Sequence, residues 1–204
     1  MRPAPCVVSV ADHTGWAHLV CVAARGNVPA VIARRRVALI DKGLPTLPYE
    51  HETTAMREDE ANAVIAGVRR SIAARTSDAL RRVLIELAPA HTAVALAIRK
   101  PPFDALPATV AAVRTSHRLL CAADGMLYQL AICRAVCERR LASTPYCVND
   151  LDVQQLGLAV FTVMRQIAGS HCPRSEPYAR AFWIRAGGAT GKRGVHPGPR
   201  TAGW

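Results

Sequence analysis

Three apolar runs open the chain and predict three consecutive strands. Cys6–Ala11 is short and rich in valine, which is typical of a strand buried on both faces. Trp16–Ala24 and Val28–Ile40 follow, each separated from its neighbour by a short turn. Because short turns join antiparallel strands, we expect an antiparallel sheet here. Arg34–Arg36 interrupt the third run, so we expect a bulge or an exposed edge at that point.

Helical periodicity begins after an irregular segment. Prolines and a glycine make residues 41–54 irregular, and Thr54 is then a suitable N-cap for a helix. Apolar residues at helical spacing carry this helix to about Leu87. Its arginines lie largely off the apolar stripe, where they form either a solvated face or a face that follows a phosphate backbone.

The second half of the chain alternates strands and helices. The expected elements are a strand at Thr92–Ile98, a helix from Pro107 to Arg140 that can bend or divide at Gly125, a strand at Tyr146–Val148 and a helix at about Val153–Ala168. We therefore expect a single α/β domain over residues 1–186. Residues 187–204 are basic and rich in glycine and proline, so we expect a disordered tail there.

The predicted order β-β-β-α-β-α-β-α resembles the ribonuclease-H-like fold, which RNase H, Holliday-junction resolvases and integrases share. The sharpest similarity lies in VVSVADHTGWAHLV, where Asp12 follows the first strand and Gly15 lies in the turn into the second. The resemblance covers about residues 6–168 and is mainly topological. It implies a mixed five-stranded sheet flanked by helices. In catalytic members it also implies several carboxylates around Mg²⁺ or Mn²⁺.

The resemblance implies that Asp12 is the central metal ligand, with Asp104 as a second. The fourth strand ends in Arg99 and Lys100 instead of an acid, and Asp104 reaches the site only if the loop before it folds back. The last predicted helix contains no acid, so the carboxylate set is incomplete. The candidate catalytic residues are Asp12, Asp104, Glu86 and Asp124. Asp124 stands in an apolar stretch and is either a buried polar contact or a functional group.

Charge points to an anionic partner. The chain has 26 Lys+Arg against 15 Asp+Glu, a formal net charge of +11, and the basic residues are almost all arginine. Guanidinium groups match the geometry of phosphates, so nucleic acid is the expected partner. The alternative is a basic surface whose charge serves only to keep the protein in solution. The residues expected to hold phosphates are Arg34, Arg35, Arg36, Arg99 and Lys100.

A histidine-rich group offers a different chemistry. His51 and Glu52 lie in the irregular segment, and His13 lies in the first turn. If that segment folds over the Asp12 edge, these side chains can hold a metal or move protons. The alternative is a polar turn and an exposed loop that do not meet.

Two helical pairs have the spacing of metal ligands. His117 and Cys121 are four residues apart, as are Cys133 and Cys137. Each pair supplies only two ligands, whereas a zinc site needs three or four, so core packing is the simpler interpretation.

These observations favour a nucleic-acid-binding protein of ribonuclease-H-like fold, with metal-dependent nuclease (phosphodiesterase) activity if the carboxylate set suffices. The alternatives are a non-catalytic interaction module of the same fold, or a small-molecule enzyme that uses His13, His51 and Glu52. No signal peptide and no window of about eighteen uninterrupted apolar residues is found, so we expect a soluble, cytoplasmic protein without membrane contact.

Overall fold

The computed structural model describes residues 3–25, 28–99, 101 and 105–146. Lys100, Asp104, the expected last helix and the expected tail lie outside the described residues. The domain boundary at residue 186 lies outside them too and stays a prediction.

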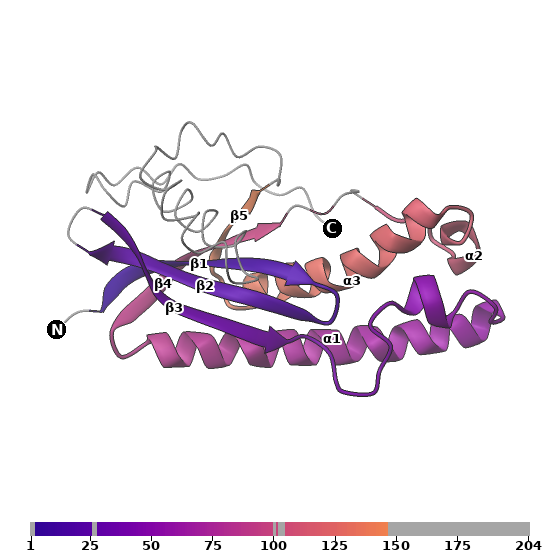
Figure 1. Cartoon of the computed structure of the whole chain (residues 1–204), viewed down its shortest axis with the longest axis horizontal. Coiled ribbons are helices and arrows are strands. Elements are labelled where there is room, and N and C mark those ends of the chain that lie inside the picture. The colour runs from indigo at the N-terminus through magenta and orange to yellow at the C-terminus, as the bar shows by residue number, and fades with distance from the viewer. Residues whose placement is uncertain (1–2, 26–27, 100, 102–104, 147–204) are drawn as a thin grey trace, which may run out of the picture.

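A five-stranded mixed sheet forms the centre of the described chain (Figure 1). Its strands are β1 (Ala4–His13), β2 (Trp16–Arg25), β3 (Val28–Ala38), β4 (His91–Arg99) and β5 (Ala142–Tyr146). They lie in the order β3-β2-β1-β4-β5. β1 to β3 are antiparallel, whereas β4 pairs parallel with β1 and β5 pairs parallel with β4. The predicted mixed five-stranded sheet is confirmed, with β1 at its centre.

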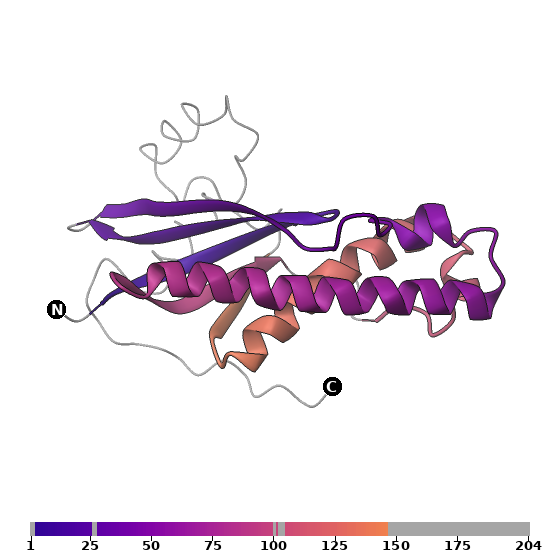
Figure 2. The ribbon, with the colours of Figure 1, turned by 90° about the horizontal axis from the view of Figure 1, so that it is seen from below.

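Two long helices cover one face of this sheet. They are α1 (Glu58–Leu87) and α3 (His117–Glu138), and both lie on the same side of the strands in Figure 2. Their apolar residues join alternate residues of the strands in one core, which includes Val8, Val10, Leu19, Cys21, Ile72, Leu80, Leu127 and Ile132. Val7, Val20 and Val22 form a smaller cluster on the other face of the sheet. Side chains of β1 and β2 therefore divide between two faces, as strand geometry requires.

α3 is the one described helix that is long and apolar enough to cross a membrane by length and composition. More than half of that stretch is buried inside the protein, as in a core helix.

The irregular segment before α1 contains a π-helical turn, η1 (Pro48–Glu52). The Thr53 N–H donates to the Pro48 carbonyl at 2.9 Å and closes this turn. The predicted start at Thr54 is therefore wrong, because the Thr54 hydroxyl donates to the His51 carbonyl instead of capping α1. α1 begins at Glu58, where the Glu60 carboxylate accepts from the Arg57 N–H.

The second predicted helix is divided, but not at Gly125. A short helix, α2 (Val110–Val113), is capped by the Thr109 hydroxyl, which accepts from the Ala112 N–H at 3.2 Å. α3 then begins after Ser116 and runs through Gly125 without a break. The segment is therefore divided between α2, which Thr109 caps, and α3, whereas the glycine is tolerated inside a packed helix.

The structure confirms the prediction for the edge strand β3 and corrects the prediction for the fifth strand. β3 is an edge strand, as its exposed arginines predicted. The fifth strand begins at Ala142, earlier than the predicted start at Tyr146, and the rest of the predicted strand to Val148 lies outside the described residues. Parallel pairing with β4, from Ala95 opposite Ala142 to Arg99 opposite Tyr146, sets this earlier register. Its serine and threonine gave no apolar run by which to predict it.

Candidate functional site

Asp12 lies on the central strand with its side chain on the helix-covered face. It is only 8% exposed and shares that face with Val8 and Val10. The Gln129 side-chain amide, from α3, donates to Asp12 Oδ2 at 3.2 Å. Arg99 is the last residue of β4, and its Nη1 lies 3.6 Å from the same oxygen. A fixed positive charge and an amide donor therefore surround the carboxylate of Asp12.

The described residues around Asp12 do not fit a two-metal centre. Mg²⁺ and Mn²⁺ prefer about six oxygen ligands each. Here one carboxylate faces one amide, whose buried Oε1 atom has no hydrogen-bond partner in the described part of the chain. Across the described residues, no group of three clustered metal-ligating side chains includes Asp12. Arg99 instead supplies a cation directly to the carboxylate.

Two of the other acids expected at this site, Glu86 and Asp124, are held elsewhere. Glu86 lies on α1 and its Oε2 accepts from Arg35 Nε at 2.9 Å. Asp124 is 1% exposed, and its two carboxylate oxygens accept the backbone N–H groups of Tyr49 and Glu50, each at 3.0 Å. Asp104 lies outside the described residues.

The contacts of Asp124 fit the first of its two interpretations, a buried polar contact. Burial raises the pKa of its carboxyl to about 6, and the two backbone donors oppose that rise. The residue fastens η1 to α3, because the amides that it accepts belong to the first half of η1.

The three arginines of β3 divide between the two faces of the sheet. Arg35 lies opposite Leu19, a core residue, and pairs with Glu86 on the helix side. Arg36 lies opposite His18, and its guanidinium carbon lies 4.3 Å from the Trp16 ring centroid. Alternation therefore sends Arg36 to the face without α1 and α3.

Rings and guanidinium groups gather on that face, which we term the aromatic–arginine face. It comprises His13, Trp16, His18, Arg34 and Arg36. The His13 and Trp16 rings stack with centroids 4.0 Å apart and planes 13° apart, and His18 meets Trp16 edge-on at 5.0 Å. Partial burial, His13 and Arg36 lower the pKa of His18, which favours its neutral form. The face thus combines flat rings with permanent positive charge.

The hollow between β3 and α1 is also lined by arginines, but acids offset those of α1. Asp78 accepts from Arg81 at 2.6 Å and from Arg82 at 2.7 Å. Arg75 lies 3.3 Å from Asp41. These ion pairs fit the solvated-face interpretation of the helical arginines.

The His13, His51 and Glu52 group does not assemble as a metal cluster. His13 stacks on Trp16, while His51 and Glu52 lie on η1. Among the described residues, the metal-ligating side chains that cluster are Glu50, His117 and Cys121.

Sequence reasoning missed Trp16 and Gln129 as parts of this region. Trp16 carried a usable signal, since it stands two residues before His18 and so shares its face in a strand. Gln129 carried none, because its meeting with Asp12 depends on how α3 packs on the sheet.

No protein-family model and no curated protein matches the sequence. Among solved structures, RuvC of T. thermophilus in complex with a Holliday junction substrate is similar at a TM-score of 0.51 and 16% identity, over 92% of this chain and 98% of that one. A second Thermus thermophilus RuvC structure gives a TM-score of 0.45 and 15% identity, over 89% and 96% of the two chains. The chain has a ribonuclease-H-like fold, as the sequence predicted.

Proposed function

We propose that this protein binds nucleic acid on the aromatic–arginine face and that Asp12 serves as the partner of Arg99 instead of as a metal ligand. The observation that carries the proposal is the stack of His13, Trp16 and Arg36 on the sheet face opposite α1 and α3. Flat rings stack on bases, and guanidinium groups pair with phosphates.

Charge and fold support the same proposal. The net charge of +11 favours association with a polyanion. The similar RuvC chain was determined with a Holliday junction, so branched DNA is the first ligand to try.

Binding measurements test the proposal on four matched probes: a four-way DNA junction, duplex DNA, single-stranded DNA and single-stranded RNA. We expect binding without divalent cations and weaker binding by the Trp16→Ala variant, by about tenfold or more if one base stacks there. Leu130→Ala is the control, because Leu130 is an exposed apolar residue on α3. Equal affinities of wild type and Trp16→Ala on all four probes would contradict the proposal.

Metal-dependent cleavage at Asp12 is the second candidate function. Two observations favour it: Asp12 lies on the central strand, and the Gln129 Oε1 atom beside it has no hydrogen-bond partner among the described residues. Such an activity requires further carboxylates from outside the described residues, with Asp104 the one that the resemblance implies.

A cleavage assay separates the two candidates. The four probes are incubated with Mg²⁺ or Mn²⁺, and wild type is compared with Asp12→Asn. Binding without turnover supports the first proposal. Cleavage that is lost in Asp12→Asn supports the second and removes the ion-pair role of Asp12.

A further inference from the structure

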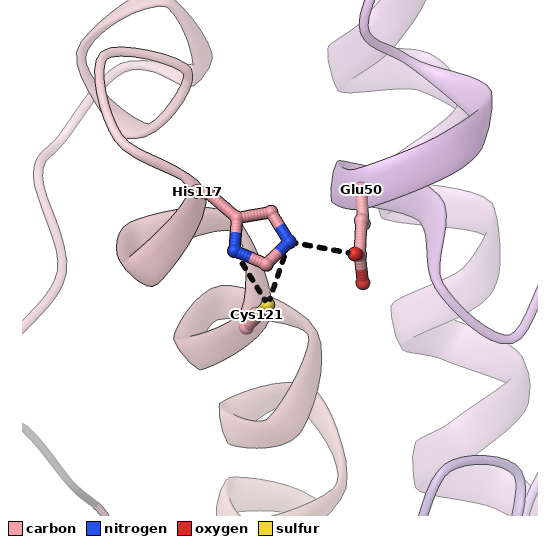
Figure 3. Close-up of side chains that lie close together, drawn as sticks. All are labelled: Glu50, His117 and Cys121. Carbon is pink, nitrogen blue, oxygen red and sulfur yellow. Dashed lines mark hydrogen bonds and ion pairs between the residues drawn. The ribbon is translucent and has the colours of Figure 1, made fainter.

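Three metal-ligating side chains converge in a group that does not include Asp12. Glu50 comes from η1, whereas His117 and Cys121 come from the first turns of α3 (Figure 3). His117 Nε2 lies 3.0 Å from Glu50 Oε1 and 3.5 Å from Cys121 Sγ. The ligand atoms of the three residues all lie within 4.8 Å of one another.

The helix accounts for two of the three ligands. Residues four apart lie on the same face of a helix, so His117 and Cys121 present their side chains together. From the sequence spacing alone, only these two ligands could be identified. The third comes from a segment more than sixty positions earlier, which only the tertiary fold brings into reach.

A rigid support holds that third ligand in place. The buried carboxylate of Asp124 accepts the Glu50 N–H itself, and the Tyr128 hydroxyl donates to the Thr46 carbonyl at 2.9 Å. Both contacts fix η1 and the residues before it against α3. The π-helical turn η1 therefore presents Glu50 from a fixed position.

The donor set and its dimensions suit zinc. Sulfur, imidazole nitrogen and carboxylate oxygen are all usual zinc ligands, and a tetrahedral ion at normal bond lengths spaces them by roughly 3.3 to 3.7 Å. The observed separations of 3.0 and 3.5 Å from His117 Nε2 are already close to that spacing. A thiolate and a carboxylate also balance the double positive charge of the ion.

We propose that Glu50, His117 and Cys121 form a Zn²⁺ site, with a water molecule as the fourth ligand. Cys121 releases its thiol proton to solvent as the sulfur–zinc bond forms, and neutral His117 binds through Nε2 with its proton on Nδ1. The ion replaces the hydrogen bond between His117 and Glu50 and fastens η1 to α3.

The test uses the full, reduced chain after removal of metals by chelation. Competition with a chromophoric chelator is expected to give one Zn²⁺ per chain at this site, and Co²⁺ is expected to show thiolate-to-cobalt charge-transfer absorption. Zinc at a hundredfold excess over its Kd is expected to raise the Tm by about 5 to 10 °C.

Variants locate the ion. Glu50→Gln, His117→Ala and Cys121→Ser are each expected to lower zinc affinity by about a hundredfold or more. Cys137→Ser is the matched control, since Cys137 is also exposed on α3 and has a cysteine four residues away.

Two results would overturn the proposal. One is wild-type zinc affinity and cobalt absorption in Cys121→Ser, and the other is loss of both in Cys137→Ser. His117 is 76% exposed in its side chain, so replacing it leaves the core intact and keeps the test readable.

Discussion

The guanidinium of Arg99 lies 3.6 Å from the carboxylate of Asp12 at the end of two parallel, neighbouring strands. β1 and β4 run side by side in the same direction, so their C-terminal residues meet at one edge of the sheet. In a metal-dependent site, an acid on β4 would share a cation with Asp12. Here the neighbouring strand supplies the cation itself.

Removal of Arg99 is expected to destabilise the protein through Asp12. Among the described residues, Arg99→Ala leaves the nearly buried carboxylate with only the Gln129 amide, so we expect the free energy of unfolding to fall by about 1 to 3 kcal/mol. Urea unfolding monitored by circular dichroism measures this change.

A double-mutant cycle is the control for that prediction. Asp12→Asn removes the charge that Arg99 neutralises, so Arg99→Ala should cost less in the Asp12→Asn background than in wild type. Strictly additive effects of the two substitutions would show that the residues do not interact.

Asp124 gives the protein a specific pH dependence. Burial raises its pKa in the folded protein from 3.8 to about 6, so the folded state favours the protonated carboxyl. Its contribution to stability is therefore fully present below pH 3.8 and is lost as the pH rises through about 6.

The difference in the free energy of unfolding between wild type and Asp124→Asn separates the contribution of Asp124 from that of the other acids. The asparagine cannot ionise, so the wild type should lose about 1 to 3 kcal/mol relative to the variant as the pH rises from about 4 to 7. Urea unfolding at several pH values measures it. Two stability curves that stay parallel across this range would refute the assignment.

Gly15 is required by the turn that follows Asp12. Its φ is +83°, and a Cβ atom there would lie 2.9 Å from Thr46 Cγ2. We expect Gly15→Ala to cost about 1 to 3 kcal/mol from backbone strain and steric overlap together. Thermal unfolding measures the loss.

Gly43 is the matched control for that substitution. Its φ is +92°, but a Cβ atom there meets nothing within 4 Å, so Gly43→Ala should show the strain alone. Thr46→Ser removes the obstructing methyl group and should recover part of the loss in Gly15→Ala. An equal cost at both glycines would mean that contact with Thr46 has no effect.

The sequence predicted the strands of the sheet better than it predicted the side-chain contacts at the strand ends. Valine runs and short turns identified β1 to β3 and placed Asp12 at the end of the first strand, because those signals are local. The pairing of Arg99 with Asp12 depends on parallel strands joined through α1, and no local pattern encodes such a register.

The same limit applies to the Glu50, His117 and Cys121 site. The spacing of His117 and Cys121 was visible in the sequence, whereas Glu50 reaches them only because Asp124 holds η1 on α3. Glu86 looked available as a metal ligand, but it pairs with Arg35 because β3 packs over α1.

The salt dependence of nucleic-acid binding tests the central claim most directly. Each phosphate contact contributes about one unit to the slope of log affinity against log salt concentration. Arg34→Ala/Arg36→Ala should lower that slope by about two units and weaken binding, whereas Arg81→Ala/Arg82→Ala, on the acid-paired α1 surface, should change it little. An unchanged slope in Arg34→Ala/Arg36→Ala would show that nucleic acid does not bind on the aromatic–arginine face.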